Sequence, residues 1–463
     1  MAFPPQSHRR TNPQIDKALT RMAADHRPVH RGTVDFGPSL KIERFVYPNG
    51  LTLLCCEDHS AKVLSFHTWI RVGSRHERPG KTGLAHLFEH LMFGETKNVG
   101  PGEYDHRLEE AGAETNASTW LDFTQFTVNA PASALPLVIE LESERMQHLA
   151  LTEKQVSTEK DVVANERRYR VDDDIEGAIS EMLWSAAFTK HSYHWPTIGW
   201  MPDIQGFCPE DCATFYRTYY APNNATLVVV GDFKLATLVE RVGKNYALIP
   251  SSVLPIEDVE PEPPQLSERR LEIDKPTPTE KLVLGYRAPA LGDNDHIALG
   301  VLAEVLSGGR PSRLLRRLVH ELEIAADARM LVGPFRDPSL IEVSITARGD
   351  HHAEELLQVL DEEFDRIRST PPSAEEIERA LNRIELGLLA GLDAVDGKAS
   401  TIGFYETLLG RPAAAFERLE AMQQCTASDL LRVARRFLQP ESRTVIFVRR
   451  TPEATGEQNT VST

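Results

Sequence analysis

The sequence predicts an α+β protein that is built from two related halves. Segments with the alternation of strands and segments with the periodicity of amphipathic helices occur along the chain. One pattern recurs: a helical segment that ends near a proline and leads into a strand occurs at Pro222 and again at Pro440, 218 residues later. Between the halves, residues 251–268 are rich in proline and acid, which is typical of a surface linker. A chain of 463 residues is also too long for one ordinary core.

The first half is expected to start after a polar arm. Its first elements are a hairpin over residues 45–55, with Asn49-Gly50 as the turn, and a strand over 63–72. A helix is predicted to begin near Thr82. The remaining elements predicted for this half are a helix over 101–111, a strand over 115–128, helices over 135–149 and 152–169, and a strand over 225–230.

The second half is predicted to repeat the first. Leu87–Leu91 aligns with Leu302–Leu306 at an offset of 215 residues, close to the 218 that separates the two prolines. In this alignment two histidines of the first half fall on Val301 and Val305. The predicted organisation is therefore an N-terminal arm (1–40), a domain that contains the two histidines (41–250), a linker (251–270), a homologous domain without them (271–450) and a disordered tail (451–463).

Composition restricts the partners and the compartment. The net charge of -17 provides no basic surplus for phosphates, so we expect no nucleic-acid partner and no anionic membrane partner. No run approaches the 18 or so apolar residues that span a bilayer, and the N-terminal residues lack the apolar stretch of a secretory signal. The five cysteines are odd in number and unpatterned, and Cys208 and Cys212 lack the second pair of a typical cysteine metal site. These features predict a cytoplasmic protein.

A histidine and glutamate motif gives the first indication of chemistry. His86 and His90 are four residues apart, so on a helix their imidazoles lie on one face, one turn apart. Two nitrogens placed in this way can bind one small cation. Glu89 precedes His90 and could accept a proton from water at that cation. A hydrolytic zinc site needs a third protein ligand and one open position for water.

A second helix offers two candidates for the third ligand. Glu159 and Glu166 are seven residues apart, so both carboxylates lie on one helix face, where one could ligate and the other could orient a histidine. The alternatives are a histidine pair that only packs and two solvated acids among basic neighbours. Apolar residues flank the histidine motif and predict its burial, and buried histidines and acids need partners. This context favours a metal site.

The chain resembles the inverted zincins, and specifically the pitrilysin-like M16 metallopeptidases, which include insulysin and the mitochondrial processing peptidase. The stretch Phe88–Thr96 is close to a signature of that family. The resemblance implies one Zn²⁺ per chain, held by His86, His90 and Glu166, because the family's third ligand follows the second histidine by about 75 residues. It also implies that Glu159 is the auxiliary acid. Glu89 would be the catalytic base.

The resemblance covers nearly the whole chain and implies its fold and substrates. Each half would be a mainly antiparallel sheet packed with helices, the LuxS/processing-peptidase-like metallohydrolase fold, and active molecules would pair two such chains around a chamber. Asn116, Ala117 and Ser118, with Asp122 and Thr124 nearby, resemble the edge strand that binds substrate backbone. Because main-chain hydrogen bonds are largely indifferent to sequence, we expect unfolded or short peptides as substrates. Without the family, an ordinary internal strand is the simpler interpretation.

One departure from the family concerns substrate positioning. After a stretch like Gly308–Leu314 the family usually carries an arginine and, seven residues later, a tyrosine, but Val319 and Ala326 stand at these positions. Neither side chain can donate a hydrogen bond. Either Arg316 or Arg317 substitutes, or a homologous M16-like partner chain supplies the Arg/Tyr pair, and we favour the partner.

The predicted function is that of a zinc metalloendopeptidase or oligopeptidase, acting as the zinc-bearing subunit of a heterodimer. The alternatives are a presequence-type processing peptidase, a homodimer with altered positioning residues, and a non-catalytic structural subunit. The complete set of His86, Glu89, His90 and Glu166 argues against the structural subunit, because a scaffold has no use for it.

Overall fold

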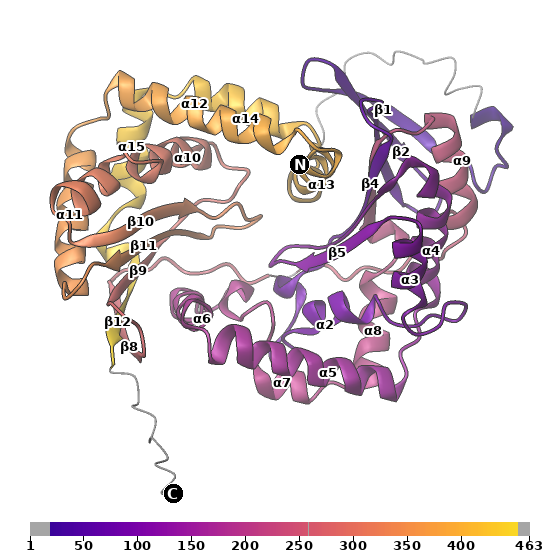
Figure 1. The fold of residues 1–463 in the computed structure, drawn as a ribbon, viewed down its shortest axis with the longest axis horizontal. Coiled ribbons are helices and arrows are strands. Elements are labelled where there is room, and N and C mark those ends of the chain that lie inside the picture. The colour runs from indigo at the N-terminus through magenta and orange to yellow at the C-terminus, as the bar shows by residue number, and fades with distance from the viewer. Residues whose placement is uncertain (1–18, 258, 452–463) are drawn as a thin grey trace, which may run out of the picture. The chain divides into compact units, whose positions relative to one another are not determined.

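The computed structural model describes residues 19–257 and 259–451 (Figure 1). The predicted tail from residue 452 onward and the first 18 residues of the predicted arm lie outside this part. The chain divides into two compact units, each made of separate segments. The first unit contains Arg167 and the described residues before it, Trp195–Glu260 and Leu388–Arg418. The second unit contains Arg168–His194, Pro261–Gly387 and the described residues from Leu419 onward.

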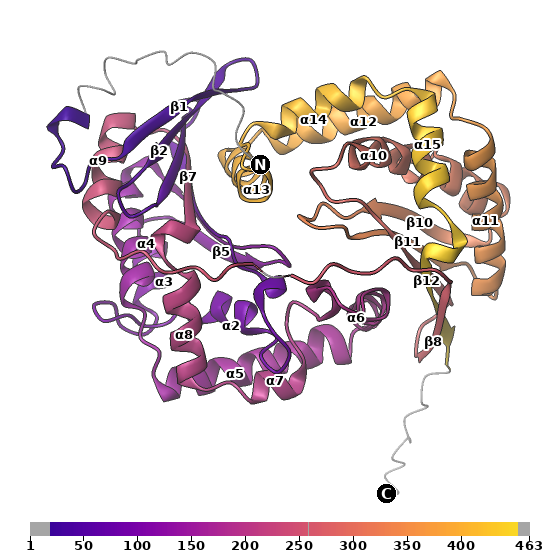
Figure 2. The same cartoon turned by 180° about the vertical axis from the view of Figure 1, so that it is seen from behind.

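The first unit is built on a seven-stranded sheet with the order β1-β2-β3-β7-β4-β6-β5. Its strands are β1 (Val29–Phe36), β2 (Leu40–Val46), β3 (Thr52–Glu57), β4 (Val63–Ile70), β5 (Glu114–Thr119), β6 (Thr124–Pro131) and β7 (Ala225–Gly231). All neighbouring strands are antiparallel except β3 and β7, which are parallel. Every residue of β7 is buried, so this strand forms the centre of the sheet, which Figure 2 shows from behind.

Of two strand predictions for this sheet, one is confirmed and one is wrong. The predicted hairpin is confirmed, because β2 and β3 are antiparallel and Gly50 in their turn has the positive φ of +88° that glycine tolerates. The single strand predicted over 115–128 is wrong: β5 and β6 form a hairpin that is closed by a bond from Trp120 N to Phe123 O of 2.8 Å. The alternation of apolar and polar residues continues through this tight turn and hides it in the sequence. The predicted arm contains β1, which pairs with β2 and buries Phe36.

Helices of the first unit cover this sheet and carry the site. They are α2 (Leu84–Leu91), α3 (Glu103–Glu110), α4 (Leu135–His148), α5 (Glu153–Arg167), α7 (Met201–Gln205), α8 (Pro209–Tyr219), α9 (Leu235–Tyr246) and α13 (Val395–Leu409). The last of these comes from the C-terminal part of the sequence and packs on β4 and β7. Ion pairs attach α13 to the sheet, including a bond of 2.7 Å from Lys398 Nζ to Asp58 and a pair between Arg44 and Glu406.

The second unit is built on a five-stranded sheet with the order β10-β11-β9-β12-β8. Its strands are β8 (Arg269–Lys275), β9 (Lys281–Arg287), β10 (Ala325–Val332), β11 (Leu340–Ala347) and β12 (Arg443–Arg450). Its helices are α6 (Ile175–Ala187), α10 (Asn294–Ser307), α11 (Ala353–Ser369), α15 (Ala427–Phe437), most of α12 (Ala374–Gly391) and the second half of α14 (Ala414–Gln423). Among the described helices, none combines the length and the apolar character that crossing a membrane requires.

Strand order confirms the predicted relation between the halves. The order β3-β7-β4-β6-β5 in the first sheet corresponds to β8-β12-β9-β11-β10 in the second, and the only parallel pairs among the described strands, β3 with β7 and β8 with β12, are equivalent. The predicted α+β class is confirmed as two mixed, mainly antiparallel sheets packed with helices. Val301 and Val305, which align with the two histidines, lie in the buried helix α10.

The units nevertheless differ from the contiguous domains that the sequence predicts. Helix α6 lies before the linker in sequence but packs on β9 and β12 of the second unit, and α13 lies after the linker but packs on the first sheet. The two halves have therefore exchanged equivalent helices. An apolar helix face predicts burial without stating which sheet will cover it, so this exchange is invisible in the sequence. The linker is also anchored: the Glu262 carboxylate accepts bonds from three successive amides, Thr189, Lys190 and His191, all within the second unit.

Candidate metal centre

Helix α2 presents one apolar face to the core and one polar face to the site. His86, Glu89 and His90 lie on the polar face and are each half-buried. The two imidazole ring centres are 5.0 Å apart. The side chains on the opposite face are buried: Leu84, Ala85, Leu87, Phe88 and Leu91. Packing on that face fixes the rotation of the helix and so directs both histidines to one side.

Helix α5 packs beside α2 and brings the predicted acids to the histidines (Figure 1). Glu166 Oε2 lies 3.7 Å from His86 Nε2 and 3.1 Å from His90 Nε2. Glu159 Oε2 lies 3.7 Å from the other nitrogen of His90, Nδ1. Glu166 therefore faces both imidazoles, whereas the Glu159 carboxylate lies behind only one of them.

The spacing of the three donors fits a single small cation. One donor atom each from His86, His90 and Glu166 can be chosen so that all three lie within 4.8 Å of one another. Zinc ligands at bond lengths of 2.0–2.2 Å in a tetrahedron are about 3.4 Å apart, close to the two nitrogen-to-oxygen distances in this site. Two imidazoles and a carboxylate are also a ligand set that zinc accepts in hydrolytic sites, which leave the fourth position open.

Charges in the site shift the pKa values of two of its groups. Burial lowers the pKa of His90, but the hydrogen bonds that His90 donates to Glu159 and Glu166 outweigh burial and raise that pKa to about 9. The cluster thus favours positive charge at this point. Burial raises the pKa of Glu89, against the lowering effect of hydrogen bonds from Thr119 and of the nearby His90. A carboxylate with a raised pKa is a better proton acceptor near neutral pH than an ordinary one.

The predicted substrate-binding residues lie at the edge of the sheet beside α2. Asn116, Ala117 and Ser118 belong to β5, which in the described part of the chain pairs with β6 alone and so has one open edge. Thr119 ends this strand and is hydrogen bonded to Glu89. The open edge and the histidine helix are therefore neighbours, which places a backbone bound to β5 close to the site.

Two residues of the family pattern lie away from that edge. Asp122 is buried in the turn after β5, 3.5 Å from Arg75. Thr124 begins β6, and its hydroxyl donates to Val72 O at 2.9 Å. Both side chains stabilise the hairpin from inside the sheet, so they are not available to a substrate.

Glu77 is a residue of the site that the motif analysis does not find. Helix α2 begins after Gly83, which has no side chain to cap the helix. The Glu77 carboxylate replaces that cap, accepting from Gly83 N at 2.8 Å and from Ala85 N at 2.7 Å. The sequence contains one weak signal for this role, a lone acid in the loop before a helix that lacks a capping residue.

In the second unit, the positions that depart from the family pattern lie as follows. Val319 is half-buried in the helical turn Leu315–Glu321, and Ala326 is exposed on β10. Arg316 and Arg317 both pair with Glu321, at 3.6 and 3.2 Å. These two arginines are therefore engaged within the second unit.

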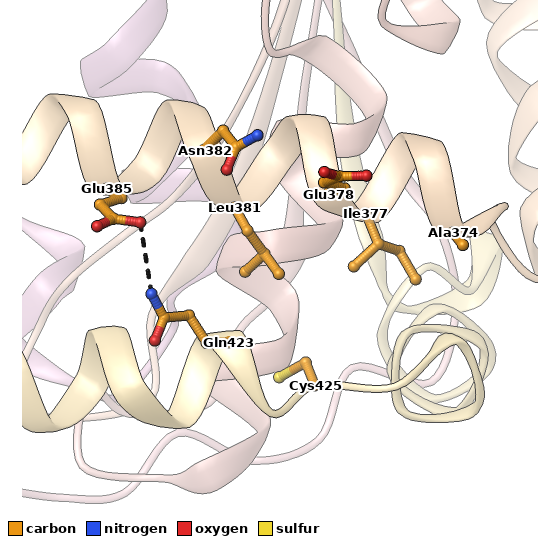
Figure 3. Close-up of a pocket in the computed structure, with 8 residues that line it drawn as sticks. All are labelled: Ala374, Ile377, Glu378, Leu381, Asn382, Glu385, Gln423 and Cys425. Carbon is orange, nitrogen blue, oxygen red and sulfur yellow. Dashed lines mark hydrogen bonds between the residues drawn. The ribbon is translucent and has the colours of Figure 1, made fainter.

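The same unit has a surface pocket of about 420 Å³ between α12 and the C-terminal end of α14 (Figure 3). It is lined by Ala374, Ile377, Glu378, Leu381, Asn382, Glu385, Gln423 and Cys425. Its closest polar contact is a bond of 3.4 Å from Gln423 Nε2 to Glu385. The pocket residues do not converge on a metal or a nucleophile in the way that the cluster on α2 and α5 does.

Comparisons with known proteins agree with this geometry. Residues 53–199 match the profile described as Insulinase (Peptidase family M16), and residues 207–384 match the one described as Peptidase M16 inactive domain. The chain is 28% identical over 414 residues to zinc protease PqqE of Helicobacter pylori, covering 88% of this chain and 93% of that protein. It is 24% identical over 419 residues to mitochondrial-processing peptidase subunit beta of Lentinula edodes, covering 88% and 89%.

A solved structure shares the whole fold. The crystal structure of a protease from Helicobacter pylori matches with a TM-score of 0.85 at 28% identity, covering 89% of this chain and 99% of that one. The two matched profiles together account for most of the chain between residues 53 and 384, and the one described as inactive includes Val301 and Val305, which stand in place of the histidines. The chain belongs to peptidase family M16.

Proposed function

We propose that the chain is a zinc-dependent endopeptidase or oligopeptidase that hydrolyses unfolded or short peptides. The observation that carries the proposal is the approach of Glu166 on α5 to both imidazoles on α2, with Glu89 on the same face. The similarity to zinc protease PqqE of Helicobacter pylori supports the same reaction class.

In this proposal His86, His90 and Glu166 would hold one zinc ion. Glu159 accepts from His90 Nδ1, which fixes the tautomer of that imidazole and leaves Nε2 free to ligate. When bound, zinc supplies a Lewis acid that polarises a peptide carbonyl and lowers the pKa of water. Three protein ligands leave a position for that chemistry.

Glu89 is the proposed catalytic base. Its carboxylate takes the proton from the attacking water and then delivers it to the amine that leaves the cleaved peptide bond. Burial raises its pKa, which favours the first half of this transfer, the uptake of the proton. Thr119 holds the carboxylate in place from the end of β5, so the substrate strand and the base share one support.

We further propose that substrates bind by adding a strand to the open edge of β5 at Asn116, Ala117 and Ser118. A homologous M16-like chain would supply the Arg/Tyr pair that Val319 and Ala326 do not provide. The proposed compartment is the cytoplasm, which the five free thiols support because a reducing compartment keeps them unpaired. Presequence processing is a narrower form of the same activity, and the likeness to mitochondrial-processing peptidase subunit beta supports it.

The test combines metal content with peptide cleavage. The purified chain should contain one zinc per molecule. Together with its partner chain it should cleave a fluorogenic peptide, and a chelator should abolish that cleavage. Glu89→Gln should keep zinc and lose turnover, whereas His90→Ala should lose the metal. Normal cleavage by Glu89→Gln would refute the role of the base. Full turnover by the chain alone, as a monomer or homodimer, would refute the need for a partner, and a chain with zinc but no turnover in any pairing would point to a structural subunit.

A further inference from the structure

A short segment after residue 197 contacts both helices that carry the candidate metal ligands. It runs from Ile198 to Phe207 and includes α7, which packs against α5. We propose that this bridging segment sets the separation of α5 from α2, and that Arg167 is a positioning residue for its neighbour Glu166. The inference rests on the metal site of the proposed function. All of these residues belong to the first unit.

The contact with the start of α2 is between backbones. Gly83 and Gly199 both have positive φ values, +93° and +86°. A Cβ atom on Gly83 would lie 2.4 Å from Ile198 O, and one on Gly199 would lie 2.3 Å from Thr82 O. Both distances are too short for any side chain, so two glycines are needed at this contact. The backbone of the bridging segment therefore meets the first turn of α2 at a fixed separation.

Hydrogen bonds through Thr82 lock this contact. Its backbone amide and its hydroxyl both donate to Asp203 Oδ2 of α7, at 3.0 and 2.7 Å. The same hydroxyl accepts from Trp200 N at 3.0 Å. Thr82 is 1% exposed, so these bonds are shielded from competing water. The start of α2 is thus attached to the bridging segment at three points.

Two basic side chains of α5 attach the other side of the segment. Arg167 Nη1 donates to Gly199 O at 2.9 Å, and its guanidinium lies 5.6 Å from the centre of the Trp200 ring. Lys160 Nζ donates to Phe207 O at 2.7 Å. The two anchors are seven residues apart, and each directly follows one of the acids that face His90. They therefore attach α5 to the segment along the two turns that carry these acids.

The attachment of α5 matters because it sets the distances between the candidate metal ligands. The two distances from Glu166 Oε2 to the imidazoles, 3.1 and 3.7 Å, depend on how far α5 stands from α2. A displacement of about 1 Å would exceed the tolerance of zinc bond lengths, which is about 0.2 Å. Loss of an outer partner at metal sites typically costs 10-fold to 100-fold in affinity. We expect removal of the Arg167 anchor to have an effect of this size.

The experiment measures zinc affinity by competition with a chelator, the visible absorption spectrum with Co²⁺ in place of zinc, and the melting temperature of the metal-free protein. Arg167→Met should weaken zinc binding at least tenfold and change the Co²⁺ spectrum, and Arg167→Lys should restore part of both. Lys160→Met tests the second anchor. Lys160 is half-buried, whereas Arg167 is buried, so this variant carries a lower risk of misfolding than Arg167→Met. Lys154→Met, at an exposed site on the same helix, is the control and should match the wild-type chain.

The outcomes separate this inference from the proposed function. Wild-type affinity and an unchanged Co²⁺ spectrum in both Arg167→Met and Lys160→Met would overturn the positioning role and leave the proposed function standing. Failure of the wild-type chain to bind either metal would overturn the proposed function, and this inference with it. If Arg167→Met does not fold, an unchanged affinity and spectrum in Lys160→Met suffice to overturn the inference.

Discussion

Gly403 offers a sharp test of how α13 is attached to the first sheet. This glycine is buried in the interior of α13, against the ring of Trp69 on β4. A Cβ atom at this position would lie 2.1 Å from Trp69 Nε1 and 2.2 Å from Cε2. Attractive contacts between such atoms occur near 3.5–4.0 Å. Gly403→Ala therefore requires α13 or the indole, which is 2% exposed, to shift by more than about 1 Å.

Two effects of opposite sign determine how much Gly403→Ala changes the stability of the first unit. Alanine stabilises a helix interior by about 0.5–1 kcal/mol relative to glycine. Overpacking a well-packed core costs about 1–3 kcal/mol, occasionally more. The net expectation is a destabilisation of about 1–2 kcal/mol, since the overlap lies at the severe end. For a unit of this size it corresponds to a fall in Tm of roughly 2–8 °C.

Calorimetry with local hydrogen exchange is the suitable assay, because the two units can unfold separately and a single Tm would then be ambiguous. The matched control is Gly387→Ala in α12, also in a helix, where an added Cβ meets nothing within 4 Å. The control should gain about 0.5–1 kcal/mol, and Gly403→Ala should lose stability and exchange faster in α13. A stabilised Gly403→Ala variant with unchanged exchange in α13 would refute the packing described for this helix.

Three further predictions concern the site and the linker. Thr119→Val removes a hydroxyl that lowers the pKa of Glu89, so the acid limb of the pH profile of kcat/KM should move to higher pH, and Thr119→Ser should leave it in place. Glu77→Ala removes the cap of α2 and should lower the free energy of unfolding by about 1–2 kcal/mol, measured by denaturant unfolding; an unchanged midpoint would contradict the capping role. Burial alone would raise the pKa of Glu262, but hydrogen bonds from three backbone amides outweigh burial and lower that pKa from 4.5 to about 2. The ionised group therefore stabilises the fold above pH 4.5, and this stabilisation is lost as the pH falls toward 2. Glu262→Gln should therefore reduce stability at neutral pH and weaken its dependence on pH in that window, and parallel curves for both proteins would refute the assignment.

The histidine motif could be predicted because its geometry is local. A spacing of four residues on a helix places His86 and His90 together whatever the rest of the chain does. Glu166 is different: a separation of 76 residues does not determine a distance in space, and only the resemblance to a family assigned it a place in the site. The structure now places it 3.1 Å from His90. Sequence periodicity could not have chosen between Glu166 and Glu159, which share one helix face.

The residues that support the candidate site without being candidate ligands could not be predicted from the sequence, for a related reason. Glu77 and Asp203 act through backbone amides that lie far along the chain or across a loop. Neither has a spacing that predicts a contact, because loop paths depend on the packing of the helices they connect. The exchange of α6 and α13 between the units could not be predicted for the same reason, because the sequence does not show which apolar faces pack together. Local patterns predict elements, and tertiary contacts decide where those elements go.

The two sheets share their strand order, yet in the described part of the chain only one of the two equivalent helices carries candidate metal ligands. On α2 the apolar face is buried, while His86 and His90 stay half-buried and face the Glu166 carboxylate. On α10 the equivalent positions, Val301 and Val305, are 0% and 1% exposed and belong to the hydrophobic core. Histidines placed there would need buried partners that the surrounding apolar core does not provide. The second half is therefore closed to metal by its packing as well as by its sequence, and restoring two histidines would destabilise that core without creating a second site.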